Sequence, residues 1–141
     1  MPDVHYQHEL SYLRSESAAR GPFPGLWVDI QQIELPGESI AVQAHIDTGA
    51  EFSVFNGFIA SGIGLDLLAG SPIQLVPTAG QGFGARLHRV QISHDILGPF
   101  ELNVAFTLDE IRRNLLGRDF LDLIQIGFRE RQHTIYVTAR P

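Results

Sequence analysis

The stretch that decides the fold is "HIDTGAEFSVFN", residues 45–56. An apolar, strand-like run, "IAVQAHI" (40–46), leads directly into Asp47, and Thr48 and Gly49 follow at once. A buried charge without a partner is costly, so a carboxylate in this position normally has a partner or a chemical role. The rest of the chain has to supply that partner if the carboxylate is to be explained.

The composition excludes several classes of protein. The chain has 141 residues, of which 44% are apolar, and this suffices for one folded domain. Sixteen acidic against ten basic residues give a net charge of -6, which argues against a nucleic-acid-binding surface. The absence of cysteine excludes disulfides, zinc–thiolate sites and a thiol nucleophile. The first residues lack the pattern of a secretory signal, and no apolar run approaches a membrane span, so we expect a cytoplasmic protein.

The pattern along the chain predicts a polar N-terminal arm and linker (1–25) and one domain (26–141). The breaker cluster "GPFPG" (21–25) separates the two, and we expect the arm to be loosely attached. Residues 53–65 mix apolar and glycine residues, so their pattern does not decide between strand and helix. Strands are predicted at 26–35, 40–46, 72–76, 85–93, 100–108 and 133–138, and a helix at 118–126. Many short strands and one late helix predict a mostly-β barrel or sandwich.

Three other kinds of site fit the sequence less well. Gly80, Gly82 and Gly84 resemble a phosphate loop, but a strand pattern follows them and the chain contains no lysine, so a hairpin tip is favoured. None of the six histidines forms a metal pattern, and we predict neither a metal nor a cofactor. His45 shares a strand face with Asp47, which fits either an ion pair or a structural histidine. No serine stands in a Gly-x-Ser-x-Gly turn, which argues against a serine nucleophile.

Two stretches have to be considered together, "AHIDTGAEFSVF" (44–55) and "NLLGRDFLDLI" (114–124). Together they resemble the signature of the retropepsin-like (retroviral-type) single-lobed aspartic proteases. That signature has an apolar pair before Asp-Thr/Ser-Gly-Ala, then two apolar residues before Gly-Arg/Asn and a short helix. The glycine-rich segment lies between the two motifs, at the place of the family's flap. The resemblance covers roughly residues 26–138 and implies a closed or partly open small β-barrel with one short C-terminal helix.

The resemblance also implies roles for individual residues. Asp47 is implied to be catalytic, activating a water molecule. The other implied positions are support of the active-site loop (Thr48, Gly49, Ala50), a structural ion pair (Glu51, Arg118), packing beneath the loop (Leu115, Leu116, Gly117) and the tip of a flap (Gly80, Gly82, Gly84).

A single catalytic aspartate per chain implies a homodimer. Of the eight aspartates, only Asp47 is followed by Thr/Ser-Gly, and the chemistry needs two carboxylates that share one proton. The partner is then expected to be Asp47 of a second subunit, with strands at 133–137 and 26–30 contributing to the dimer. The implied function is an aspartic endopeptidase acting on an extended peptide or protein. Two alternatives stay open: a weak or inactive retropepsin-fold module for dimerisation or peptide binding, and a small β-barrel that binds a non-peptide ligand.

Overall fold

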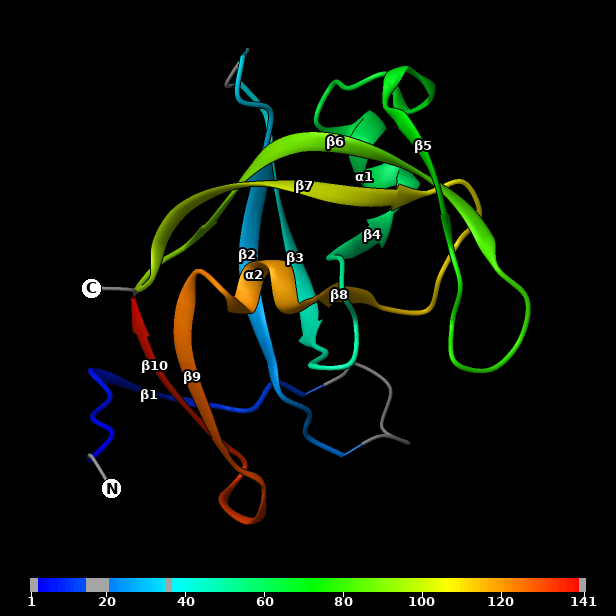
Figure 1. Ribbon diagram of the computed structural model, residues 1–141. Coiled ribbons are helices and arrows are strands. Elements are labelled where there is room, and N and C mark those ends of the chain that lie inside the picture. Colours follow the sequence, from blue (N-terminus) through cyan, green and yellow to red (C-terminus); the bar gives the residue numbers. More distant parts are fainter. Residues whose placement is uncertain (1–2, 15–20, 35–36, 140–141) are drawn as a thin grey trace.

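The computed structural model describes residues 3–14, 21–34 and 37–139, and strands predominate among them (Figure 1). Six strands occur in the order β2-β3-β8-β4-β7-β6, and pairing of β2 with β6 closes them into a barrel. The mostly-β fold and the small closed barrel predicted from the sequence are thereby confirmed. The six are β2 (Gly25–Gln31), β3 (Ser39–Ile46), β4 (Val54–Asn56), β6 (Phe83–His94), β7 (Gly98–Thr107) and β8 (Asn114–Leu116).

Alternation of side chains along the barrel strands creates the core. Along β2, Leu26, Val28 and Ile30 are buried, whereas Trp27 is exposed and Asp29 is half-buried. Successive side chains of a strand point to opposite faces, so a shift of register by one residue would exchange these two sets. Burial of each large apolar side chain stabilises the fold by about 1.5–3 kcal/mol, which favours this one register strongly.

A β-hairpin extends the sheet beyond the barrel. Strand β5 (Ser71–Leu75) pairs with the first part of β6 in an antiparallel register that ends at Leu75 and Phe83. Residues 76–82 therefore connect the two strands, and Figure 1 shows this connection projecting away from the barrel. The predicted strands at 72–76 and 85–93 and the hairpin between them are confirmed.

A second, three-stranded sheet has the order β1-β10-β9, formed by β1 (His8–Ser11), β9 (Ile124–Arg129) and β10 (Thr134–Ala139). Strand β10 thus has a neighbour on each side within its own chain. Strand β2 likewise lies between β3 and β6. In the chain as described, neither of the two strands that were expected to contribute to the dimer therefore has a free edge.

The N-terminal residues are more firmly attached than the sequence predicted. Tyr12 is 7% exposed, packs in the main core and donates a hydrogen bond to the Glu130 carboxylate. Leu13 exchanges backbone hydrogen bonds with Phe23, and β1 adds the pairing with β10. A segment with a buried aromatic side chain and paired backbone groups belongs to the domain, so residues 8–13 are not a loose arm. Residues 15–20, also within the predicted arm, lie outside the described residues.

The structure corrects the prediction for residues 118–126 and decides the one left open for residues 53–65. The helix predicted at 118–126 is present only as α2 (Arg118–Leu121), because residues from Ile124 onward pair with β10 as β9. A single helical turn has little stability of its own, so tertiary strand pairing decides where it ends. The undecided residues 53–65 contain β4 and then α1 (Gly57–Gly62), and the 3₁₀ turns η1 (Leu67–Ala69) and η2 (Glu130–Gln132) follow later in the chain.

Within residues 3–14, 21–34 and 37–139, no helix has both the length and the apolar character that crossing a membrane needs.

Candidate active site

The Asp47 carboxylate stands in a tight turn at the end of β3. The Asp47 N–H donates to the Leu116 carbonyl (3.0 Å), and the Ala50 N–H donates back to the Asp47 carbonyl (3.2 Å). The Gly49 N–H donates to Asp47 Oδ1 at 2.9 Å, so the turn holds one carboxylate oxygen in place. Asp47 is half-buried, while Thr48 and Gly49 are exposed. The carboxylate is therefore fixed by backbone geometry and still accessible.

The second motif lies directly beside this turn. Strand β8 runs parallel to the end of β3, with Leu115 opposite His45 and Leu116 opposite Ile46. The next residue, Gly117, approaches the first motif so closely that a Cβ there would lie 2.5 Å from the Phe52 carbonyl oxygen. No side chain fits at that distance, which explains the glycine. The two motifs that the sequence separates by some 60 residues thus meet at one place in the fold, as the resemblance implied.

Asp119 joins the two motifs through a network that the sequence did not reveal. Its carboxylate accepts hydrogen bonds from the Ser53 N–H (3.0 Å) and the Ser53 hydroxyl (2.7 Å). The same hydroxyl accepts a hydrogen bond from the Gly117 N–H at 3.1 Å. Ser53 is fully buried and the Gly117 bond to it is shielded from water, whereas the two bonds to Asp119 are partly buried. The only signal in the sequence was an acidic residue in the first turn of the expected helix.

The predicted ion pair between Glu51 and Arg118 is absent. Both residues are exposed, and among the described residues no ion pair within 4.0 Å joins them. The two positions are linked through the backbone instead: the Arg118 N–H donates to the Ala50 carbonyl (2.8 Å) and the Asp119 N–H to the Glu51 carbonyl (3.3 Å). An exposed ion pair is worth about 1 kcal/mol at most, so the two backbone hydrogen bonds are the firmer connection.

The three glycines predicted for the hairpin tip are only partly located there. Gly80 and Gly82 lie in the connection 76–82, and Gly80 has a φ of 96°, a conformation that glycine adopts without strain. Gly84 lies within β6, opposite Gln74, and its backbone carbonyl accepts from the Leu108 N–H at 3.0 Å. Gly84 therefore lies in the paired part of the hairpin, one pair before the connection, and not in the connection itself.

An apolar cluster connects the hairpin to the Asp47 turn. It is separate from the main core and is built around three buried residues, Val54, Ala85 and Ala105. The side chains packed against it are only partly buried: Phe52, Ile73, Leu75, Phe83, Leu87, Ile111 and Leu115. They come from the segment that follows the Asp47 turn, from both strands of the hairpin, and from the second motif and the segment before it. The arrangement places partly buried apolar side chains on the hairpin and on both motifs.

His45 takes a place in the barrel wall beside the turn. Its ring stacks on that of Phe23 with a centroid distance of 3.8 Å and an interplanar angle of 8°. Phe23 belongs to the segment that leads into β2, and the carbonyl of its neighbour Pro24 accepts the Ile46 N–H at 2.9 Å. The stack therefore packs the entry of β2 against the end of β3, which is a structural role.

No family model and no curated protein matches the chain. Solved structures do match it. The retropepsin-like aspartic protease from Rickettsia conorii aligns with a TM-score of 0.62 and 16% identity, over 99% of this chain and 100% of that one. The chain has a retropepsin-like fold. EIAV protease, solved in complex with the inhibitor HBY-793, aligns with a TM-score of 0.54 and 18% identity, over 78% of this chain and 92% of that one.

The similarity of this retropepsin-like chain to the two solved structures concerns the fold. The role of each residue has to be inferred from its geometry in this structure. The structure brings together Asp47, its turn, and the motif at Leu115–Gly117, with the apolar cluster beside them. It leaves Glu51 and Arg118 without the ion pair that was predicted for them.

Proposed function

We propose that the chain is an aspartic endopeptidase that acts as a homodimer, with one Asp47 from each subunit. The observation that carries the proposal is the Asp47 turn itself. Its carboxylate is accessible, is held by the Gly49 N–H, and stands beside the second motif in a retropepsin-like fold. A carboxylate placed in this way can exchange protons with a bound water.

The second carboxylate has to come from another chain. The Asp119 side chain bonds to the segment that follows the Asp47 turn, and both of its oxygens accept hydrogen bonds from Ser53. It is therefore engaged in holding the loop. A two-fold axis beside the exposed Thr48–Gly49 turn would bring two copies of Asp47 together, as an isologous dimer does. In that dimer the Thr48 hydroxyl would bond to the opposing loop.

The chemistry follows from two adjacent carboxylates. Like charges at about 3 Å cannot both ionise, so one Asp47 is protonated and the other is a base. The base takes a proton from a water, whose oxygen attacks the carbonyl carbon of the peptide bond. The acid gives its proton to the carbonyl oxygen. Collapse of the resulting diol breaks the C–N bond, and the amine leaves with a proton returned by a carboxyl group.

The substrate we propose is an extended peptide or a flexible segment of a protein. It would lie between the Asp47 turn and the β5–β6 hairpin, with the connection 76–82 acting as a flap that excludes water. Extended peptides bind like an added strand, with alternate side chains in pockets. The apolar cluster around Val54 and Ala105 would then favour apolar side chains near the scissile bond.

The proposal is tested with the Asp47→Asn variant. Asparagine preserves the shape of the side chain but cannot act as the base, so cleavage of a peptide library between pH 3 and 7 should fall by roughly 10²–10⁴-fold or more. Asp3→Asn, which makes the same chemical change at an exposed position 44 residues before Asp47 in the sequence, should cleave like the wild type. Equal cleavage by wild type and Asp47→Asn would remove Asp47 from the mechanism.

Mixing the two proteins tests the dimer. If each active site needs two copies of Asp47, random pairing in an equal mixture puts about half of the wild-type subunits into inactive heterodimers. Activity per wild-type subunit should therefore fall to about half. Unchanged activity would mean that each chain works alone. A dimeric wild-type protein that cleaves nothing would instead support the module for dimerisation or peptide binding.

A further inference from the structure

One peptide group links the Asp47 turn to the second motif. It joins Leu116 to Gly117, so its carbonyl oxygen and its N–H belong to the same rigid plane and point in opposite directions. The Leu116 carbonyl accepts the Asp47 N–H at 3.0 Å. On the other side of the plane, the Gly117 N–H donates to the Ser53 hydroxyl oxygen at 3.1 Å. Whatever orients the Gly117 N–H therefore also orients the oxygen that holds Asp47.

The Asp119 carboxylate sets the direction of the Ser53 hydroxyl. A hydroxyl has a single proton, and this one is donated to Asp119 Oδ1 at 2.7 Å. The lone pairs of the hydroxyl oxygen are then free to accept the Gly117 N–H. Hydrogen bonds in such a chain polarise one another, so the bond to a charged carboxylate also strengthens the bond that the hydroxyl accepts.

Three donors converge on the Asp119 carboxylate. Oδ1 accepts from the Ser53 hydroxyl and from the Phe120 N–H, each at 2.7 Å, and Oδ2 accepts from the Ser53 N–H at 3.0 Å. An ionised carboxylate accepts on both oxygens, whereas an amide of the same shape has one accepting oxygen and one donating nitrogen. In either orientation of an amide, its NH₂ group would face one of these N–H donors. The position therefore requires a carboxylate.

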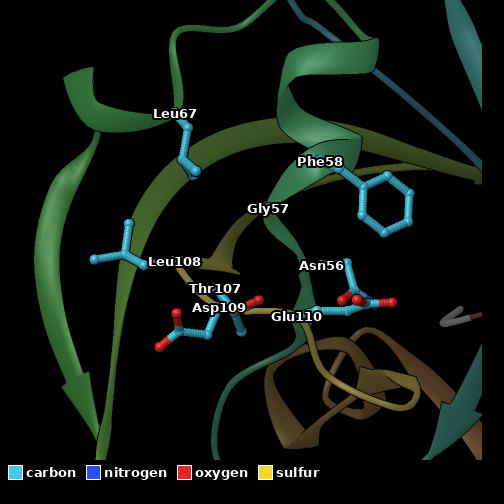
Figure 2. A pocket seen from close by; sticks show the side chains of 8 residues that line it. All are labelled: Asn56, Gly57, Phe58, Leu67, Thr107, Leu108, Asp109 and Glu110. Atoms are coloured by element: carbon cyan, nitrogen blue, oxygen red, sulfur yellow. The ribbon is translucent and has the colours of Figure 1, made fainter.

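The other end of β8 is held independently. Asn56, labelled in Figure 2, accepts the Ile111 N–H on its side-chain oxygen at 2.8 Å and donates to the Asn114 side-chain oxygen at 3.1 Å. Asn114 is the first residue of β8. Because Asn56 anchors this end of the strand, the contact between Ser53 and Asp119 has only to fix the peptide group at which the strand ends.

We propose that Asp119 is a positioning residue for Asp47, acting through the Ser53 hydroxyl and the peptide group between Leu116 and Gly117. The inference rests on the proposed endopeptidase, because the position of Asp47 affects a rate only if Asp47 takes part in the reaction. A displacement of about 1 Å at a reacting group can lower a rate by roughly 100-fold. The effect of Asp119 should therefore appear in kcat.

Asp119→Asn keeps the shape of the side chain and replaces one acceptor with a donor. We expect kcat for a cleaved peptide to fall at least about tenfold while KM stays within about twofold, since the hairpin and the apolar cluster proposed to bind the peptide are unchanged. Rates are measured well below Tm, where circular dichroism shows both proteins to be folded, so that lower stability does not reduce kcat. An Asp119→Asn variant with the kcat of the wild type would overturn the proposal.

Two controls separate positioning from other effects. Asp109→Asn makes the same chemical change at an exposed residue, which lines a hollow beside α1 (Figure 2). Tyr12→Phe removes a hydrogen bond in the main core and leaves the Asp47 turn untouched. Both should keep the kcat and KM of the wild type. A loss of kcat in Tyr12→Phe as large as in Asp119→Asn would assign the effect to stability and contradict positioning.

A double substitution tests the route through Ser53. If Asp119 acts on Asp47 through the hydroxyl, Ser53→Ala already breaks the connection. Adding Asp119→Asn to Ser53→Ala should then lower kcat by less than about twofold further, because residues that act in one network are not additive. Two losses that multiply in full would show that Asp119 acts by another route.

NMR of the full chain tests the same connection without turnover. In Asp119→Asn, the amide proton signals of Asp47 and Gly117 should move upfield because their hydrogen bonds weaken, while the signals of β10 stay in place. A change of stability alone does not move the signals of the folded state, and an unchanged Asp47 signal would overturn the proposal. If the Asp47 signal moves but the wild type cleaves no peptide, the connection stands and the proposed function is the part that fails.

Discussion

Ser53→Ala tests the connection that holds the two motifs together. The substitution removes one oxygen atom from a fully buried site and changes nothing else in the side chain. That oxygen donates to Asp119 Oδ1 at 2.7 Å and accepts the Gly117 N–H at 3.1 Å. Its removal deprives the Asp119 carboxylate of one hydrogen-bond donor and leaves the buried Gly117 N–H group without an acceptor.

The magnitude follows from these two bonds. A hydrogen bond to a charged group contributes about 1.5–3 kcal/mol, and a buried donor left unsatisfied costs about 1–3 kcal/mol. We therefore expect Ser53→Ala to lower the free energy of unfolding by about 2.5–6 kcal/mol. For a chain of this length, each kcal/mol corresponds to roughly 3 °C in Tm, so Tm should fall by about 8–18 °C.

Urea unfolding followed by circular dichroism, with a calorimetric scan, measures the change. The matched control is Ser61→Ala, which makes the same chemical change at an exposed position of α1 and should stay within about 0.5 kcal/mol of the wild type. A Ser53→Ala variant that also stays within 0.5 kcal/mol would refute the reasoning. It would mean that the Asp47 turn does not depend on Ser53 and Asp119.

The remaining predictions concern pH. Burial, with the hydrogen bond and negative charge of Glu130, raises the pKa of Tyr12 to about 12, so the folded state favours the neutral phenol. Its stabilising contribution is complete below pH 10 and is lost as pH rises towards 12. Tyr12→Phe should lower the free energy of unfolding at pH 7 by about 1 kcal/mol. It should also remove this contribution to the loss of stability between pH 10 and 12, and an equal loss in the variant would contradict the role of Tyr12. Burial lowers the pKa of His94 despite the opposing charge of Asp95. Its neutral ring accepts the Ile96 N–H at 3.1 Å, so this stability is present above pH 6.5 and lost as pH falls below it. His94→Gln should flatten the stability profile between pH 7 and 5, and an unchanged slope would assign that slope to other groups.

Much of the fold could be predicted because its signals are local. The alternation of Leu26, Val28 and Ile30 marks a strand buried on one face, and such a pattern depends only on residues two apart in the chain. The strands at 40–46, 72–76 and 85–93 were found in the same way. The position of Asp47 directly after an apolar strand was also visible in the sequence, and β3 ends at Ile46.

The failures have a common cause. At Ile124–Ile126 a helical spacing of apolar residues gave way to pairing with β10, because the backbone groups there have a partner strand. The Glu51–Arg118 ion pair was predicted from resemblance, yet both side chains are exposed and water competes for them. The polar residues 8–11 showed no strand pattern, and only their pairing with β10 orders them.

The sequence by itself determined that the chain is a mostly-β domain and that Asp47 directly follows an apolar strand. It did so through the spacing of apolar residues, which depends only on neighbours in the chain. The tertiary structure alone decided that Ser53 meets Asp119 across 66 positions and that β1 covers an edge of β10. Such contacts depend on how segments far apart in the sequence pack together. Local sequence patterns do not show them, because residues such as Ser53 and Asp119 look like ordinary polar residues among their neighbours in the chain.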